Sequence, residues 1–330
     1  MKVLSHSGAL ARFIIFAVVL LLYSLAGAQS AKIQRVGVIL PGGAWSETIR
    51  GLRDGLRDLS LHEGKQFSLT VRETKGDVSA KEEAAKAFEQ EKVNLLYTTA
   101  SSVTVAARRA TKDIPIVFAA GADPVVLGLV ESFAKPGGRL TGVFYRDSDL
   151  ISKRLEILKE IVPKLRRLVT FYNPHSPVSV ESAKLVREET TRLQGIVFME
   201  KHVGTVEELQ AVLRTLRVRE MDAIFEVTDA MVQTQDQLVI DAAAAKRLPT
   251  MFVNDSSVLK GGLASYSVSR HEIGRLSARY VQRIFAGDSP SDLPVQGVDK
   301  IELILNLKTA KQIGLTIPPN VLARADRVIR

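Results

Sequence analysis

The sequence predicts an α/β protein with two doubly wound, Rossmann-like lobes, each built on a parallel sheet. From Val36 onward, short apolar runs alternate with amphipathic segments of helical period. The alternation occurs in two series, and the first is complete by about Gly142. The chain has 330 residues, of which 46% are hydrophobic and 25% charged, so it is long enough for two such domains.

The first unit of the pattern is a strand, a turn and a helix. Residues 36–40 are a continuous apolar run, and residues 41–43, Pro-Gly-Gly, turn the chain. Apolar residues then recur at helical spacing at Ile49, Leu52 and Leu56. The rest of the first lobe is predicted to contain strands at 68–71, 94–97 and 116–118 and helices at 80–91 and 103–111.

The second series repeats this alternation. It is predicted to contain strands at 168–172, 196–200, 223–227 and 250–253 and helices at 151–161, 180–193, 206–219 and 231–246. A tail adds strands at 263–267 and 301–305, a helix at 272–285 and a Gly/Ser/Pro/Asp-rich connector at 287–294. The tail is too short for a third domain, so we expect it to return to both lobes and form a hinge with several crossings.

The N-terminus has the three-part pattern of a secretory signal peptide. Lys2 and Arg12 precede an uncharged apolar segment at 13–25, and small residues follow at Ala26 and Ala28. We therefore expect a signal peptide at residues 1–28, cleaved after Ala28. The alternative is a retained membrane anchor, which needs about 20 apolar residues.

The absence of cysteine limits the chemistry of the chain. With no cysteine there are no disulfides, no thiolate chemistry and no lipid-bearing cysteine. The predicted product is therefore unlipidated, and with its signal peptide we expect it to be secreted and free in the periplasm of a bacterium with two membranes. We expect a monomer.

The formal net charge of +9 does not predict a nucleic-acid partner. Basic residues are interleaved with acidic ones, as in Lys81-Glu82-Glu83, and are not massed on one segment. We therefore expect a solvated surface and no nucleic acid. An acidic partner surface or an anionic membrane remains an alternative.

Motifs of catalysis and cofactor binding are absent from the sequence. It contains no G-x-G-x-x-G, no Walker lysine loop, no G-x-S-x-G and no H-E-x-x-H. The histidines are dispersed without metal-ligand spacing. We predict no catalytic residue, no cofactor and no metal.

Ligands of open parallel sheets bind beyond the carboxyl ends of the strands, near helix N-termini. Polar loops follow six of the predicted strands, and they supply the candidate ligand-binding residues. These are Trp45, Ser101, Ser102, Gly121, Asp123, Asn173, Ser176, Asp229, Asn254 and Asp255.

Each candidate also has a structural interpretation. Ser102, Asp123 and Ser176 are suitable N-caps, Asn173 suits a turn before proline, and Trp45 suits the core. Clustering of six polar loops at one end of two sheets favours a ligand site.

Asp229 is the candidate for a ligand cation. It follows the strand at 223–227, and we expect it to bind the ammonium group of an amino-acid-like solute, with the helix start at Ser101 and Ser102 holding the carboxylate. The alternative is that Asp229 caps the helix that begins near Met231.

The mature chain resembles the tryptophan/tyrosine-type ABC transporter substrate-binding proteins over nearly its whole length. The resemblance is carried by TKDIPIVF at 111–118, DPV at 123–125, GLV at 128–130, KPGG at 135–138, TGV at 141–143, NLKTAK at 306–311, GLTIPP at 314–319 and LARAD at 322–326. The chain departs from the family pattern at Ala100 and Ala230, where proline and asparagine are usual, so the resemblance does not identify the ligand.

The resemblance implies the type I periplasmic binding protein fold. It places the N-terminal lobe at 31–145 plus 269–290 and the C-terminal lobe at 146–268 plus 291–330. It also implies a protein that captures a small-molecule ligand by closing a hinge and delivers it to an ABC permease in the inner membrane.

Three other functions are alternatives. A ligand sensor would present the same closed form to a membrane receptor kinase. An exported α/β enzyme would need a cofactor loop or a nucleophile, and none is found. A transcription regulator of this fold would carry a helix-turn-helix where this chain has a signal peptide.

Overall fold

The computed structural model describes residues 33–145, 147–217, 220–298 and 300–330. Residues 34–330 form a compact unit. The predicted signal peptide, residues 1–28, lies outside the described residues. Within the described part of the chain, no helix combines the length and the apolar character needed to cross a bilayer.

The first sheet has six strands among the described residues, in the order β11-β5-β4-β3-β1-β2, and all of its strand pairs are parallel. Its strands are β1 (Gln34–Leu40), β2 (Phe67–Glu73), β3 (Leu95–Thr99), β4 (Ile116–Ala120), β5 (Leu140–Phe144) and β11 (Gln296–Gly297). Strands β3, β4 and β5 are buried throughout, as expected for strands covered on both faces.

The second sheet has seven strands among the described residues, in the order β13-β12-β10-β9-β8-β6-β7. They are β6 (Arg167–Tyr172), β7 (Val197–His202), β8 (Ala223–Phe225), β9 (Thr250–Phe252), β10 (Ala264–Val268), β12 (Ile301–Asn306) and β13 (Arg327–Ile329). Only the β10–β12 pair is antiparallel within this described sheet. The predicted α/β class with two mostly parallel sheets is confirmed.

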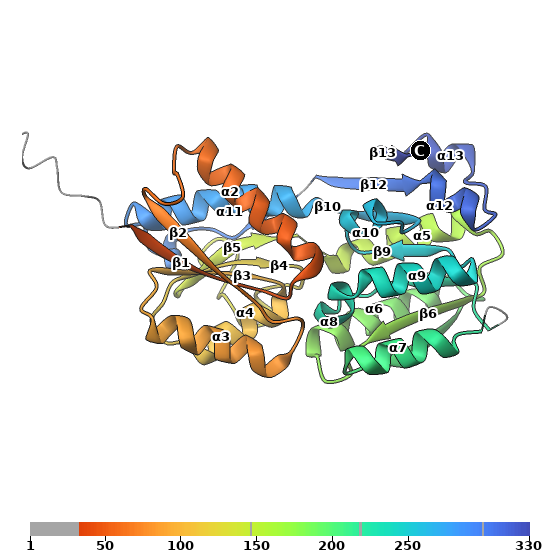
Figure 1. The fold of residues 1–330 in the computed structure, drawn as a ribbon, viewed down its shortest axis with the longest axis horizontal. Helices are drawn as coiled ribbons and strands as arrows, with labels where there is room; N and C mark the ends of the chain where they lie inside the picture. Colours follow the sequence, from red (N-terminus) through yellow and green to blue (C-terminus); the bar gives the residue numbers. More distant parts are fainter. Residues whose placement is uncertain (1–32, 146, 218–219, 299) are drawn as a thin grey trace, which may run out of the picture. The chain divides into compact units, whose positions relative to one another are not determined.

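Helices cover both sheets, and Figure 1 shows α2 and α11 on one face of the first sheet and α3 and α4 on the other. The helices of the first lobe are η1 (Gly43–Trp45), α2 (Ser46–Asp58), α3 (Val78–Gln90), α4 (Ser101–Ala110), α11 (Arg270–Phe285) and η3 (Pro290–Asp292). Those of the second are η2 (Asp147–Leu150), α5 (Ile151–Ile161), α6 (Pro177–Arg192), α7 (Val206–Thr215), α8 (Ala230–Thr234), α9 (Asp236–Lys246), α10 (Asp255–Leu259), α12 (Leu307–Gln312) and α13 (Pro319–Leu322). The helix predicted at 231–246 is thus two helices, which meet at Gln235.

The chain passes between the two sheets after β5, after β10 and after β11. The last crossing falls later than the sequence-based division placed it. That division assigned 291–330 to the second lobe, but Gln296 and Gly297 pair with β5, and the Val298 amide donates to the Phe144 carbonyl at 2.9 Å. Residues 291–298 therefore belong with the first sheet.

Helices α2 and α11 approach each other at glycines. A Cβ atom added to Gly51 would lie 1.9 Å from the carbonyl oxygen of His271, and one added to Gly274 would lie 1.9 Å from that of Thr48. Because no Cβ fits there, only glycine lets the two backbones come this close. The contact brings the first turn of α11 beside the start of α2, where Trp45 lies.

Candidate functional site

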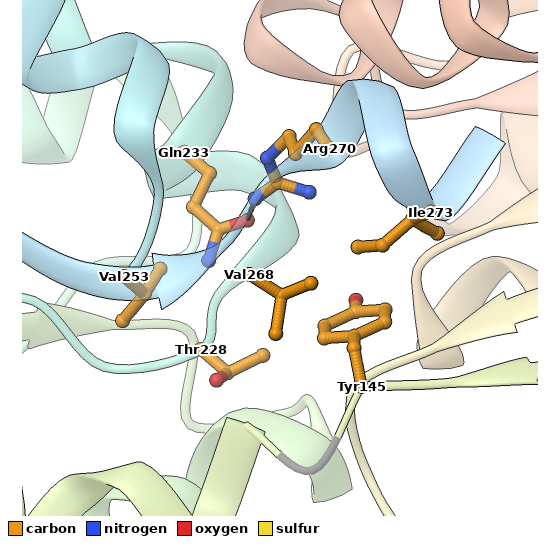
Figure 2. A pocket seen from close by; sticks show the side chains of 7 residues that line it. All are labelled: Tyr145, Thr228, Gln233, Val253, Val268, Arg270 and Ile273. Atoms are coloured by element: carbon orange, nitrogen blue, oxygen red, sulfur yellow. Dashed lines mark hydrogen bonds between the residues drawn. The ribbon is translucent and has the colours of Figure 1, made fainter. Parts of the chain in front are cut away.

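Two small cavities lie among the residues that follow the carboxyl ends of the strands. Figure 2 shows the first, and its lining residues are Tyr145, Thr228, Gln233, Val253, Val268, Arg270 and Ile273. The second is lined by Trp45, Ala100, Ser101, Ser102, Tyr145, Ser176, Val178, Ser179, Thr228, Ala230 and Gln233. The two linings share Tyr145, Thr228 and Gln233, and we call their combined residues the strand-end site. Each cavity has a volume of about 10 Å³, about the space that one water molecule occupies.

The fold supplies this site from both sheets. Trp45 follows β1 of the first sheet, and Tyr145 follows β5. Thr228 follows β8 of the second sheet, and Arg270 begins α11 directly after β10. In parallel sheets these positions lie at the strand ends where α/β proteins bind ligands.

A stacked pair of side chains joins the two cavities. The Cζ atom of Arg270 lies 3.5 Å from the centre of the Trp45 ring, and the Trp45 and Tyr145 rings have centroids 6.3 Å apart. Trp45 is 1% exposed and Arg270 is 3% exposed. Such a cation over an indole face is a favourable contact when both groups are desolvated.

The guanidinium of Arg270 has only part of its hydrogen-bonding capacity used. Its Nη2 donates to Gln233 Oε1 at 3.0 Å (Figure 2). Its Nε and Nη1, and the Trp45 indole Nε1, have no hydrogen-bond partner among the described residues. Buried donors are nearly always paired in folded proteins, so three unpaired donors in one site are unusual.

The family of the chain follows from a match that spans almost all of the described residues. Residues 33–329 match the model of the ABC transporter substrate binding protein family. The chain belongs to this family.

Two of the proteins similar to this chain bind amino acids, and a third was solved without a ligand. A tyrosine-binding protein of Clostridioides difficile (strain R20291) is 28% identical over 292 residues, which are 87% of this chain and 83% of that protein. The crystal structure of an ABC domain from Streptococcus pneumonia in complex with L-Trp has a TM-score of 0.82 at 23% identity, covering 90% of this chain and all of that one. A ligand-free, open substrate binding protein from Clostridium difficile has a TM-score of 0.61 at 26% identity, with coverage of 90% and 99%.

In this substrate-binding protein, four of the predicted site residues line the strand-end site: Trp45, Ser101, Ser102 and Ser176. Ser101 Oγ accepts from the amides of Gly121 and Ala122 at 3.1 and 3.0 Å, so it ties the loop after β4 to the start of α4. Ser102 Oγ is buried without a hydrogen-bond partner among the described residues. Ser176 caps α6 and also lines the cavity.

Three other predicted residues have local structural roles. Asp123 accepts from the amides of Val125 and Val126 at 2.8 and 3.2 Å, as a turn former does. Asn173 accepts from the amide of His175 at 2.8 Å. Gly121 and Asp123 line an adjoining hollow of about 180 Å³ beside α6, whose lining shares Val178 and Thr228 with the strand-end site.

Asp229 is a helix cap. Its Oδ1 accepts from the amides of Met231 and Val232, each at 2.9 Å, and its Oδ2 accepts from the amide of Asn173 at 2.8 Å. It is absent from the residues that line the two cavities, and the Lys81 ammonium acts on it as a nearby positive charge. The contacts therefore support the capping interpretation.

Asn254 belongs to a buried polar cluster next to the site. It caps α10, and its Nδ2 donates to Asp236 Oδ2 at 3.2 Å. Ser257 Oγ also donates to Asp236, and the Val253 amide donates to Glu226 Oε2 at 2.9 Å. The carboxyl groups of Glu226 and Asp236 are close enough to hydrogen-bond to each other when one holds a proton.

Burial favours the protonated forms of these acids. It raises the pKa of Glu226 well above its ordinary value, and the neighbouring Asp236 carboxyl raises it further. Burial also raises the pKa of Asp236 and of Asp255, while the positive charge of Arg270 lowers all three. Burial thus opposes ionisation of these acids, and the nearby guanidinium of Arg270 works against that effect.

Three lining residues were not predicted from the sequence. No strand was predicted before Tyr145, Gln233 lies inside the predicted helix at 231–246, and Arg270 precedes the helix that was predicted to begin at 272. One signal was present. A basic residue in the first turn of a helix is disfavoured by the helix dipole, so Arg270 at the start of α11 indicates a role other than helix stability.

Among the described residues, no group of three or more His, Asp or Glu side chains is arranged to hold a metal ion.

The acid cluster predicts a pH dependence of stability that Glu226→Gln reduces. Because the folded state keeps its carboxyl protons to higher pH than the unfolded state, the free energy of unfolding falls as pH rises from the ordinary carboxyl range through the raised pKa of Glu226. Each such proton contributes a slope of up to about 1.4 kcal/mol per pH unit. In Glu226→Gln the amide keeps the hydrogen bonds without titrating, so we expect a shallower decline.

Urea unfolding between about pH 4.5 and 8 measures this difference. Glu207→Gln is the control, because Glu207 is an exposed glutamate on α7. Equal pH slopes for wild type and Glu226→Gln would contradict the assignment.

Proposed function

We propose that this chain is the solute-binding component of an ABC importer and that two lobes close over a small organic solute in the strand-end site. The observation that carries the proposal is the composition of that site. Its lining residues come from both sheets. Trp45 and Tyr145 follow strands of the first sheet, and Thr228 follows a strand of the second. A solute bound there touches both lobes at once, and the relatives that bind tyrosine and L-Trp make amino acids the first solutes to test.

The similarity to two relatives in different states supports closure. The chain has a TM-score of 0.82 to the L-Trp complex but 0.61 to the ligand-free, open protein, although the identities are similar at 23% and 26%. Since each cavity here holds about one water molecule, a solute enters only when the lobes separate. A solute that contacts both lobes only in the closed form then shifts the population toward that form.

Two glycines of the first lobe lie against the second lobe. A Cβ atom added to Gly43 would lie 3.1 Å from Thr234 Cα, and one added to Gly76 would lie 2.5 Å from Met231 Cα. Both distances are tighter than ordinary van der Waals contact. These glycines let the backbones of the two lobes approach, and we assign them the role of permitting closure.

The closed form is proposed to dock on a permease of the inner membrane, with no catalytic step. We further propose that the protein is exported, cleaved after Ala28, and works as an unlipidated monomer in the periplasm. Intact mass of the exported protein tests the processing, and a retained N-terminus would contradict it.

The first experiment identifies the solute and its effect. Small molecules released from natively purified protein are identified by mass spectrometry and then added back. A solute that binds only the folded protein stabilises it by about 2.7 kcal/mol at a hundredfold excess over Kd. We expect a higher melting temperature and a smaller radius of gyration by small-angle scattering. An unchanged radius at saturation would argue against closure.

The second experiment separates closure from folding with two matched glycine variants. Gly76 and Gly64 have nearly the same backbone angle, with φ of +81° and +84°, but a Cβ on Gly64 would meet nothing within 4 Å. Alanine is therefore similarly strained at both positions, and only Gly76→Ala obstructs the approach of the lobes.

We expect Gly76→Ala to weaken solute binding at least tenfold, a cost of about 1.4 kcal/mol or more. Gly64→Ala should bind as wild type does, with a comparable loss of thermal stability. Calorimetric titration with the identified solute measures both. Equal affinities of the two variants would remove the closing role of Gly76.

A further inference from the structure

Arg270 is a buried cation whose own protein partners leave two of its nitrogens unused. It is 3% exposed, and among the described residues its one hydrogen-bond acceptor is Gln233 Oε1. Nε and Nη1 have no partner among the described residues, and no carboxylate of this part of the chain lies within ion-pair distance of the guanidinium. A buried charge without hydrogen-bonding partners is strongly destabilising, so its retention calls for a function.

The neighbouring acids do not provide that partner. Glu226, Asp236 and Asp255 act on Arg270 electrostatically but not through a hydrogen bond. Burial raises the pKa of each of these carboxyl groups, which favours their neutral forms. None of the three supplies an oxygen to Nε or Nη1 of Arg270, so those two nitrogens remain available to a ligand.

Other residues of the strand-end site also leave polar groups free to donate hydrogen bonds to a ligand. Among its described lining residues, Arg270 is the single charged side chain. Trp45 Nε1 and Ser102 Oγ are further polar atoms without a partner there. In Figure 2 the guanidinium and the Gln233 amide lie on one side of the first cavity, and the apolar side chains of Val268 and Ile273 lie beside them.

We propose that Arg270 binds a carboxylate of the solute through its free guanidinium edge, so that the solute is a small carboxylic acid with a short apolar body. Nη2 keeps a second proton beyond the one given to Gln233, and it can pair with a neighbouring N–H to meet two carboxylate oxygens. The planar face of the guanidinium rests on Trp45, which fixes its orientation. Val253, Val268 and Ile273 contact the apolar part of the solute.

This inference rests on the proposed solute-binding function and names the chemical class that the site accepts. It predicts that binding requires the carboxylate. The probes are pyruvate, L-lactate, isovalerate, L-leucine, L-tyrosine and L-tryptophan, each compared with its primary amide by calorimetric titration of the full mature chain. We expect one or more of the acids to bind and the matching amide to bind at least tenfold more weakly.

Variants of Arg270 test the residue itself. Arg270→Gln keeps a hydrogen-bonding side chain without charge, and we expect at least a tenfold loss of affinity for the acid that binds. Arg279→Gln is the control, because Arg279 is an exposed arginine of the same helix, and its loss changes net charge without touching the site. We expect the affinity of Arg279→Gln to remain within about twofold of wild type. A tenfold loss in Arg270→Gln then cannot come from the change in net charge alone, since salt screens long-range effects of exposed charges.

The thermal stability of solute-free Arg270→Met separates binding from a structural role. Methionine is an unbranched apolar side chain that adapts to irregular space. If Arg270 serves the solute, removing its incompletely paired charge leaves the melting temperature equal or higher while acid binding is lost. If it serves as the counter-ion of the acid cluster, the melting temperature falls.

Several results would overturn the proposal: equal binding of an acid and its amide, wild-type affinity in Arg270→Gln, a lowered melting temperature in Arg270→Met, or a wild-type protein that binds none of the acids. An amide or other neutral solute that binds and compacts the protein would overturn the carboxylate assignment while leaving solute binding intact. The absence of any compacting solute, among extracted compounds and probes alike, would count against the proposed function itself.

Discussion

The arrangement of the site depends on the contact between Arg270 and Trp45. The guanidinium lies 3.5 Å from the indole centre because α2 and α11 approach at Gly51 and Gly274, where a Cβ atom would collide with the opposing backbone. Helix α11 follows β10 of the second sheet but packs in the first lobe, on α2. The crossing of the chain after β10 therefore places Arg270, which follows a strand of the second sheet, on Trp45, which follows β1 of the first sheet.

The electrostatics of the site follow from this placement. Arg270 is held at a helix N-terminus, which is itself partly positive, and its face is covered by Trp45. Burial raises the pKa of the acids nearest to it. None of these acids hydrogen-bonds to the guanidinium, so its Nε and Nη1 stay unpaired. A cavity with this balance attracts an anionic group, whereas an ammonium group would meet a like charge. The carboxylate that was expected to attract such an ammonium, Asp229, is occupied by three backbone amides.

Much of the fold could be predicted from the sequence because strands buried on both faces read as short apolar runs. Strands β1, β3, β4, β6, β8 and β9 were found in this way. Strand β11 consists of Gln296 and Gly297 and has no apolar run, so its pairing with β5 was not visible. In the site, Trp45, Ser101, Ser102 and Ser176 were found because they follow strands. Gln233 and Arg270 were missed because their meeting depends on how α8 and α11 are placed in three dimensions, which no local pattern encodes.

The two cavities of the strand-end site are too small for a solute unless the site changes shape. Trp45 is the largest side chain of the lining, and with Arg270 on its face it fills space that a ligand would otherwise occupy. The remaining volume is about 10 Å³ in each cavity, which is less than any organic solute needs.

A carboxylate can therefore reach the free donors of Arg270 only if the lobes separate or if the Trp45–Arg270 stack shifts. Separation keeps the cation on the indole only if Arg270 moves with Trp45, and the glycine contact between α2 and α11 ties it to that lobe. Opening would then break the bond between Arg270 and Gln233, since Gln233 lies on α8 of the other lobe. The guanidinium would lose its last protein acceptor in the open form, and a carboxylate arriving there would replace it before the lobes close again.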